Sequence, residues 1–82
     1  MYNREKGIYP AGEYLVGTDI DEGAYLLISD NDSSGQVQVY ENYKKYREGE
    51  SMSYHIFEKE YHLALRERGT YISVDNAYLK RV

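Results

Sequence analysis

The stretch Gly12-Glu13-Tyr14-Leu15 recurs as Gly23-Ala24-Tyr25-Leu26 and again as Gly69-Thr70-Tyr71-Ile72. In each copy a glycine precedes an aromatic residue and aliphatic residues, and an Asp follows a few positions later. Glycine permits a turn, whereas tyrosine and branched aliphatic residues favour extended backbone, so this phrase is typical of the start of a β-strand. Its repetition predicts an all-β protein.

Short apolar or alternating segments continue this pattern along the chain. Strands are expected at residues 13–17, 24–29, 36–40, 52–57, 61–65, 70–74 and 77–79. Residues 56–67 contain good helix formers, but their period-two alternation favours a strand. Residues 42–50 are expected to form an exposed loop or a brief helical turn. Roughly six or seven short strands without βαβ alternation predict a small antiparallel β-sandwich or a partly open barrel.

The alternation also predicts which side chains face the core. The segment 24–29 is apolar on both faces, which is typical of a central, well-covered strand. Elsewhere the residues expected to point inward are Val37, Val39, Ile72 and Val74, and Tyr61, Leu63 and Leu65 are expected to share one face.

The length and charge limit the classes of partner. We expect one domain over residues 1–82, with residues 1–7 disordered or extended. Ten basic and fourteen acidic residues give a net charge of −4 without a long basic patch, so nucleic acid is not an expected partner. No apolar run is long enough to span a membrane and no export signal is visible. We therefore expect a soluble chain, at the cell surface only if it belongs to a longer exported protein.

The small core has consequences of its own. There is no cysteine, so disulfides cannot supplement it. A sheet with short strands and open edges often completes its core by pairing with another copy, which predicts a homo-oligomer.

Three segments carry a resemblance to a known module: YPAGEYLVGTDIDEGAY at 9–25, GQVQVY at 35–40 and GTYISVDNA at 69–77. Together they resemble the β-rich G-x-Y-x-V-G-x-D-I-P-A-G-x-Y module of Gram-positive bacterial surface proteins and lipoproteins. This chain has Asp21-Glu22 where that pattern has Pro-Ala, so its turn before Gly23 is less rigid. The module has no established activity, so the resemblance implies an accessory or binding domain and transfers no active site. We expect no cofactor.

The segment 30–41 contains the best candidate for a metal site. Asp30, Asp32, Ser34 and Glu41 match the oxygen-ligand spacing of a calcium-binding loop, with Gly35 at its sixth position. The flanking segments, however, resemble strands rather than helices. If they form a hairpin, Glu41 lies some 15–20 Å from the turn, too far to close a calcium cage. A simple polar hairpin turn is the alternative.

Two histidines provide a second set of candidates. His55, Glu58, Glu60 and His62 have the ligand types that zinc prefers, but on a strand only Glu60 and His62 share a face. Surface histidines on a sheet are the alternative. No serine has a paired base in the sequence, so we do not expect an enzyme.

The tyrosines suggest a binding surface. Eleven of the twelve aromatic residues are tyrosines, and Tyr40, Tyr43, Tyr46 and Tyr54 surround one charged segment. If they project together, they form a platform for a partner protein, a second copy of the chain or a glycan. A mobile loop with one or two rings on the sheet edge is the alternative. We therefore expect a noncatalytic binding module, or alternatively a structural module that binds calcium or zinc.

Overall fold

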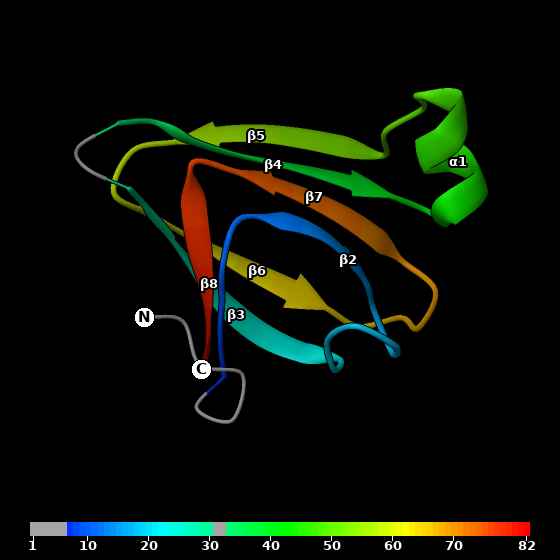
Figure 1. Cartoon of the computed structure of the whole chain (residues 1–82), viewed down its shortest axis with the longest axis horizontal. Coiled ribbons are helices and arrows are strands. Elements are labelled where there is room, and N and C mark those ends of the chain that lie inside the picture. The colour runs from blue at the N-terminus through cyan, green and yellow to red at the C-terminus, as the bar shows by residue number, and fades with distance from the viewer. Residues whose placement is uncertain (1–6, 31–32) are drawn as a thin grey trace.

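The computed structural model describes residues 7–30 and 33–82. They form eight β-strands and one short helix (Figure 1). The strands are β1 Ile8–Tyr9, β2 Gly12–Leu15, β3 Gly23–Ser29, β4 Gly35–Tyr40, β5 Ser53–Phe57, β6 Glu60–Leu65, β7 Tyr71–Asp75 and β8 Ala77–Arg81. Helix α1, Tyr43–Glu48, lies between β4 and β5. Of the segment 1–7, only Gly7 is among the described residues, and its carbonyl accepts a hydrogen bond from the Arg81 N–H at 2.7 Å.

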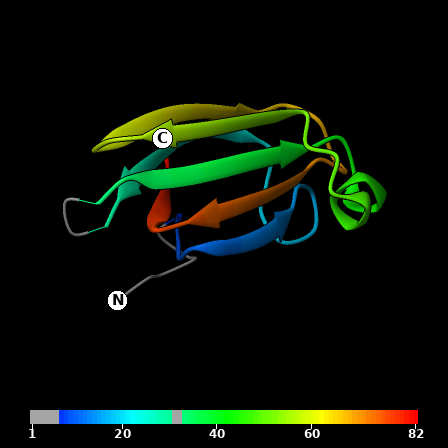
Figure 2. The ribbon, with the colours of Figure 1, turned by 90° about the horizontal axis from the view of Figure 1, so that it is seen from above.

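The strands form two four-stranded antiparallel sheets that pack against each other (Figures 1 and 2). Sheet A has the order β1-β8-β3-β6, and sheet B has the order β2-β7-β4-β5. This arrangement confirms the all-β prediction and selects the sandwich over the barrel. The described residues contain eight strands rather than six or seven because Ile8 and Tyr9 pair with Lys80 and Leu79 of β8.

Consecutive strands often belong to different sheets. The segment 30–34 joins β3 of sheet A to β4 of sheet B, so the expected hairpin at this turn is wrong. A turn rich in Asp, Asn and Ser can form a hairpin within one sheet or a connection between two sheets. Its composition does not specify which strand the next strand pairs with. The turn between β5 and β6 also passes from one sheet to the other.

The inner faces of the two sheets form the core, as the alternation predicts. Most of the buried core residues come from the four interior strands: Tyr25, Leu27, Val37, Val39, Ile72, Val74, Ala77 and Leu79. On β6, Leu65 is buried and Tyr61 and Leu63 are half-buried. Ile20 is also buried, although its surroundings in the sequence are polar, because Val16 and Ile20 form a bridge that turns both side chains inward.

The repeated glycine phrase begins β2 and β3. Gly12 and Gly23 have φ angles of 153° and 151°, which residues with a Cβ adopt only with strain. The tyrosine two positions later points inward in both copies, and the Tyr25 ring is completely buried. Its hydroxyl donates to the Asp21 carbonyl at 2.6 Å, which satisfies the one polar group of that ring.

Helix α1 is the helical turn expected within residues 42–50. Its N-cap is Asn42, whose side-chain oxygen accepts from the Lys45 N–H at 2.8 Å. Its C-cap is Gly49, in a left-handed conformation. Figure 1 shows α1 at one end of sheet B, where β4 ends. Neither described range contains a helix long and apolar enough to cross a membrane.

Candidate functional site

Four tyrosine rings pack together where α1 lies on the outer face of sheet B. We call Tyr40, Tyr43, Tyr46 and Tyr71 the tyrosine cluster. Tyr46 is central: its ring centroid lies 4.5 Å from that of Tyr71, 5.2 Å from that of Tyr40 and 5.9 Å from that of Tyr43. Tyr43 also contacts Tyr71 edge-on at 5.2 Å. Such edge-on and stacked pairs stabilise a cluster by more than the burial of their apolar surface alone.

The sheet register explains why these rings meet. Tyr40 on β4 and Tyr71 on β7 are directly opposite each other, and both side chains point away from the core. Tyr40 would be exposed there, but α1 covers it and leaves it only 6% exposed. The cluster thus attaches the helix to the sheet and holds Tyr43, which is 48% exposed, in one position.

Hydrogen bonds fix two members of the cluster further. The Tyr46 hydroxyl donates to the Glu13 carboxylate on β2 at 3.2 Å, and the Tyr40 hydroxyl donates to the Gln38 side chain. The bond to Glu13 raises the pKa of Tyr46, and burial raises the pKa of Tyr71. Both phenols, Tyr46 and Tyr71, therefore stay protonated to a higher pH than an ordinary tyrosine.

The positive charges beside the cluster are partly neutralised. The Lys45 ammonium lies 3.0 Å from Glu50 and 3.7 Å from Glu48, and its hydrogen bond to Glu50 raises its pKa. The Arg47 guanidinium instead lies 6.0 Å from the centre of the Tyr43 ring. Arg47 is therefore the cation associated with the exposed ring.

The structure places Tyr54 apart from these ring contacts. Tyr54 lies on β5, and its hydroxyl donates to the Gln36 side chain at 2.9 Å. It is 46% exposed on the outer face of sheet B, beside Ile56, which is 60% exposed. Of the predicted platform, Tyr40, Tyr43 and Tyr46 come together, whereas Tyr54 extends the same face toward its edge.

The candidate calcium ligands are widely spaced where they are described. Asp32 lies outside the described residues. Asp30 and Ser34 precede β4, whereas Glu41 follows it. The six residues of β4 separate the two ends by about 20 Å. The segment has another role: the Asn76 side chain donates to the Ser34 carbonyl at 3.0 Å, and the Asp30 N–H donates to the Asn76 carbonyl at 2.9 Å.

The two histidines occupy different environments. His55 is half-buried on the inner face of β5, where its ring stacks on Tyr61 at 4.9 Å. His62 is exposed on the outer face of β6, together with Glu60. In the described part of the chain, no three His, Cys, Asp or Glu side chains are grouped closely enough to hold a metal ion.

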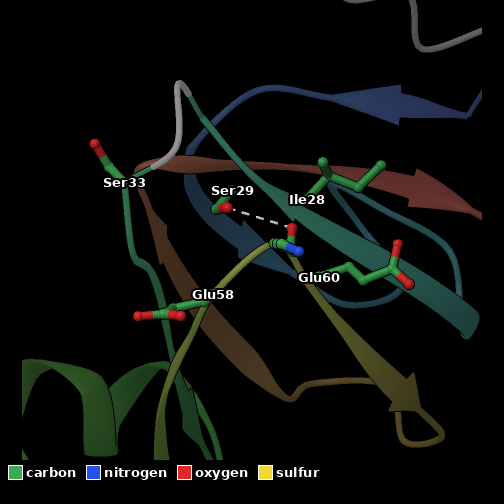
Figure 3. Close-up of a pocket in the computed structure, with 6 residues that line it drawn as sticks. Ile28, Ser29, Ser33, Glu58 and Glu60 are labelled. Atoms are coloured by element: carbon green, nitrogen blue, oxygen red, sulfur yellow. Dashed lines mark hydrogen bonds between the residues drawn. The ribbon is translucent and has the colours of Figure 1, made fainter.

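A shallow cleft lies beside the turn between β5 and β6. It is lined by Ile28, Ser29, Ser33, Glu58, Lys59 and Glu60. The Ser29 hydroxyl donates to the Lys59 carbonyl at 3.3 Å, and Figure 3 shows Glu58 and Glu60 pointing in different directions. Among the described residues of the cleft, the Ser29 hydroxyl is bonded to a backbone carbonyl, and the carboxylates of Glu58 and Glu60 do not face each other.

A second groove opens between the edges of the two sheets. Its walls are β5 and β6, and we call it the edge groove. It is mostly apolar and is lined by Val39, Met52, Ser53, His55, Tyr61, Leu63, Ala64, Leu65, Arg66, Glu67 and Thr70. The strand alternation identifies the apolar residues in this set, but only the sheet order shows that they line an opening.

Comparisons with protein-family models, curated proteins and solved structures found no match to this chain.

Proposed function

We propose that this protein is a noncatalytic binding module that docks a partner protein on the outer face of sheet B, beside α1. One observation carries the proposal. Among the described residues, five large hydrophobic side chains are exposed, and four of them, Tyr43, Met52, Tyr54 and Ile56, fall in the short segment from α1 to β5. Exposed apolar side chains that gather in one region are typical of interaction sites.

The chemistry of this region supports a protein partner. Tyrosine and methionine are enriched at protein interfaces, as is arginine, which Arg47 provides beside Tyr43. Tyr43 is already held by two neighbouring rings, so binding would cost little side-chain entropy. Gln36 and Gln38 lie on the same face and offer hydrogen bonds next to the apolar contacts.

A glycan is the second candidate ligand. The Tyr54 ring is held by its hydrogen bond to Gln36, and an exposed ring beside side-chain amides can stack on a sugar and bond to its hydroxyls. The resemblance to a bacterial surface module supports a role as an accessory domain of a Gram-positive cell-surface protein.

Site-specific photo-crosslinking tests the proposal. A photoreactive phenylalanine replaces Tyr54 in the full chain, and covalent adducts are identified by mass spectrometry in cells that produce the protein. The matched control carries the same group at Tyr78, which lies on the outer face of sheet A. We expect a defined protein adduct from position 54 that Tyr43→Ala abolishes.

Two results would contradict this function. Adducts that form equally at positions 54 and 78, or that survive Tyr43→Ala, would show that the surface has no specificity. Binding on a glycan array that is lost in Tyr54→Ala, without a protein adduct, would select the glycan instead.

A further inference from the structure

Strand β6 forms one edge of sheet A, with polar backbone groups directed outward. Among the described strands, β6 pairs only with β3. The Ser29 N–H donates to the Lys59 carbonyl at 2.8 Å. This bond shows which residues of the two strands face each other as hydrogen-bonded pairs. In an antiparallel ladder every second residue bonds to a given neighbour, so Tyr61, Leu63 and Leu65 bond to β3. The N–H and C=O groups of His62 and Ala64 therefore face the open edge.

The sequence around β6 has opposite charges at its two ends. It reads EKEYHLALRER from Glu58 to Arg68, with Leu63 at its centre. Reversing the segment about Leu63 places Glu60 opposite Arg66 and Lys59 opposite Glu67. It also places Glu58 opposite Arg68, but Arg68 already donates to the Gly17 carbonyl and so contributes least. Every charge thus meets its opposite when two copies of the strand run antiparallel.

We propose that two copies of the protein pair through β6, antiparallel and centred on Leu63, and so join their A sheets into one continuous sheet. The partner at this edge is a second copy of the chain. The inference goes beyond the proposed ligand surface, because it uses β6 rather than α1 and the outer face of β5.

The register agrees with the backbone. Centring on Leu63 places His62 opposite Ala64 of the second copy, and these are the residues whose N–H and C=O groups face the edge. Leu63 then falls at a non-hydrogen-bonded position, where side chains approach most closely. A shift of one residue would place His62 opposite Leu63, whose backbone groups are already bonded to β3. Backbone hydrogen bonds can therefore form in this register, but not in a register shifted by one residue in either direction.

The side chains also match on both faces of the joined sheet. On the inner face, Leu63 meets Leu63, and Tyr61 meets Leu65 of the second copy. Tyr61 and Leu63 line the edge groove and are only half-buried in a single copy, so pairing covers apolar surface there, whereas Leu65 is already buried. On the outer face, Glu60 meets Arg66, and the small side chain of Ala64 leaves room for His62. Like charges occur at none of these positions, whereas an unrelated strand has no reason to match them.

The centre of β6 also lacks protection against pairing. Edge strands that avoid association carry a charged residue or a proline near the middle. Between Tyr61 and Leu65 this strand has neither, and its formal charges lie at the ends. The two edges that bound the groove lie along one side of the molecule, at the top of Figure 2.

A pair of charge reversals tests the register. Glu60→Arg and Arg66→Glu each place like charges opposite each other twice in the dimer, and the mass in solution is measured over a concentration series by light scattering and sedimentation. Alone, each variant should self-associate roughly thirtyfold more weakly than the unmodified chain (about 2 kcal/mol). Mixed together, the two variants should form a heterodimer, because positions 60 and 66 are both basic in one variant and both acidic in the other, so each pair again joins opposite charges.

Lys80→Glu is the matched control, since it changes the net charge as Arg66→Glu does but lies on β8, inside the sheet. It should dimerise like the unmodified chain. A strictly monomeric unmodified chain would overturn the inference, as would equal association in all variants or a mixture that stays monomeric. A mixture that dimerises where its components do not cannot be explained by misfolding. Tyr43→Ala should leave the dimer intact, so a failure of one proposal is distinguishable from a failure of the other.

Discussion

Replacing Gly35 with alanine should destabilise the sandwich, because the Phe57 ring occupies the space that a Cβ would need. Gly35 is directly opposite Phe57 in the ladder between β4 and β5. A Cβ on Gly35 would lie 2.6 Å from Cζ and 2.7 Å from Cε2 of Phe57, and 3.1 Å from the Ala77 Cβ. Carbon atoms pack at about 3.5–4.0 Å, so the ring must move. It is 7% exposed and stacks on Tyr61 at 5.7 Å, so little free space surrounds it.

Two opposing effects determine the magnitude. Overpacking a core costs about 1–3 kcal/mol, whereas replacing glycine in ordinary extended backbone gains about 0.4–1 kcal/mol by restricting the unfolded chain. The first effect is larger, so the free energy of unfolding should fall by about 1–2 kcal/mol. In a domain of this size the midpoint of thermal unfolding should fall by roughly 5–15 °C. Circular dichroism during heating, with urea titrations beside it, measures both quantities.

A double-mutant cycle with Phe57→Leu identifies the cause. Leucine lacks the two ring atoms that meet the new Cβ, so Gly35→Ala should cost little in its presence. The coupling energy should be about 1–3 kcal/mol. The reasoning is refuted if Gly35→Ala leaves the stability unchanged, or if its cost is the same with leucine at position 57.

Three other predictions concern the helix cap, the buried phenols and the segment 30–41. Asn42→Ala removes the acceptor for the Lys45 N–H and should lower the free energy of unfolding by about 1 kcal/mol. Asn42→Asp keeps an acceptor and should not lower it. Urea titrations measure both variants, and equal losses of stability would contradict the role of Asn42 as the helix cap. Burial raises the pKa of Tyr25 and of Tyr71. The folded state then holds these protons more tightly, so the stabilisation from these two groups should be constant below about pH 10 and be lost above it. Stability should therefore fall above about pH 10 while the tyrosinate absorbance of these residues appears later than that of free tyrosine; stability that rises there would refute this. Calcium and EDTA should leave the unfolding midpoint unchanged, since β4 separates the ends of the segment 30–41; a calcium-dependent rise would restore that site.

The strands could be predicted from the sequence, whereas their partners could not. The glycine phrase and the alternation of Val37 and Val39 reflect local backbone preference and burial, which neighbouring residues encode. The choice between a hairpin and a crossing after β3 depends on the whole sandwich, and the same polar turn serves both. The pattern does not reveal strand β1, because its two residues before Pro10 are too few to show alternation.

The tyrosine cluster was predictable only in part. Tyr40, Tyr43 and Tyr46 are close in sequence, so their proximity follows from chain length. Tyr71 joins them because the β4–β7 register places it opposite Tyr40, and nothing local to either residue indicates this pairing. The separation of Tyr54 has a similar cause, since its hydroxyl bonds to Gln36 on the neighbouring strand.

The positions of β7 and β8 bear on how the chain acquires its structure. Each lies inside its sheet, β7 between β2 and β4 and β8 between β1 and β3. While the protein is being synthesised, neither sheet can close until residues 71–81 have left the ribosome. Before then, β3 can pair with β6 and β4 with β5, but β1 and β2 have no partner strand. Such sequence-distant pairing is associated with folding in milliseconds to seconds rather than microseconds, and a premature stop before residue 71 would remove the central connection of both sheets.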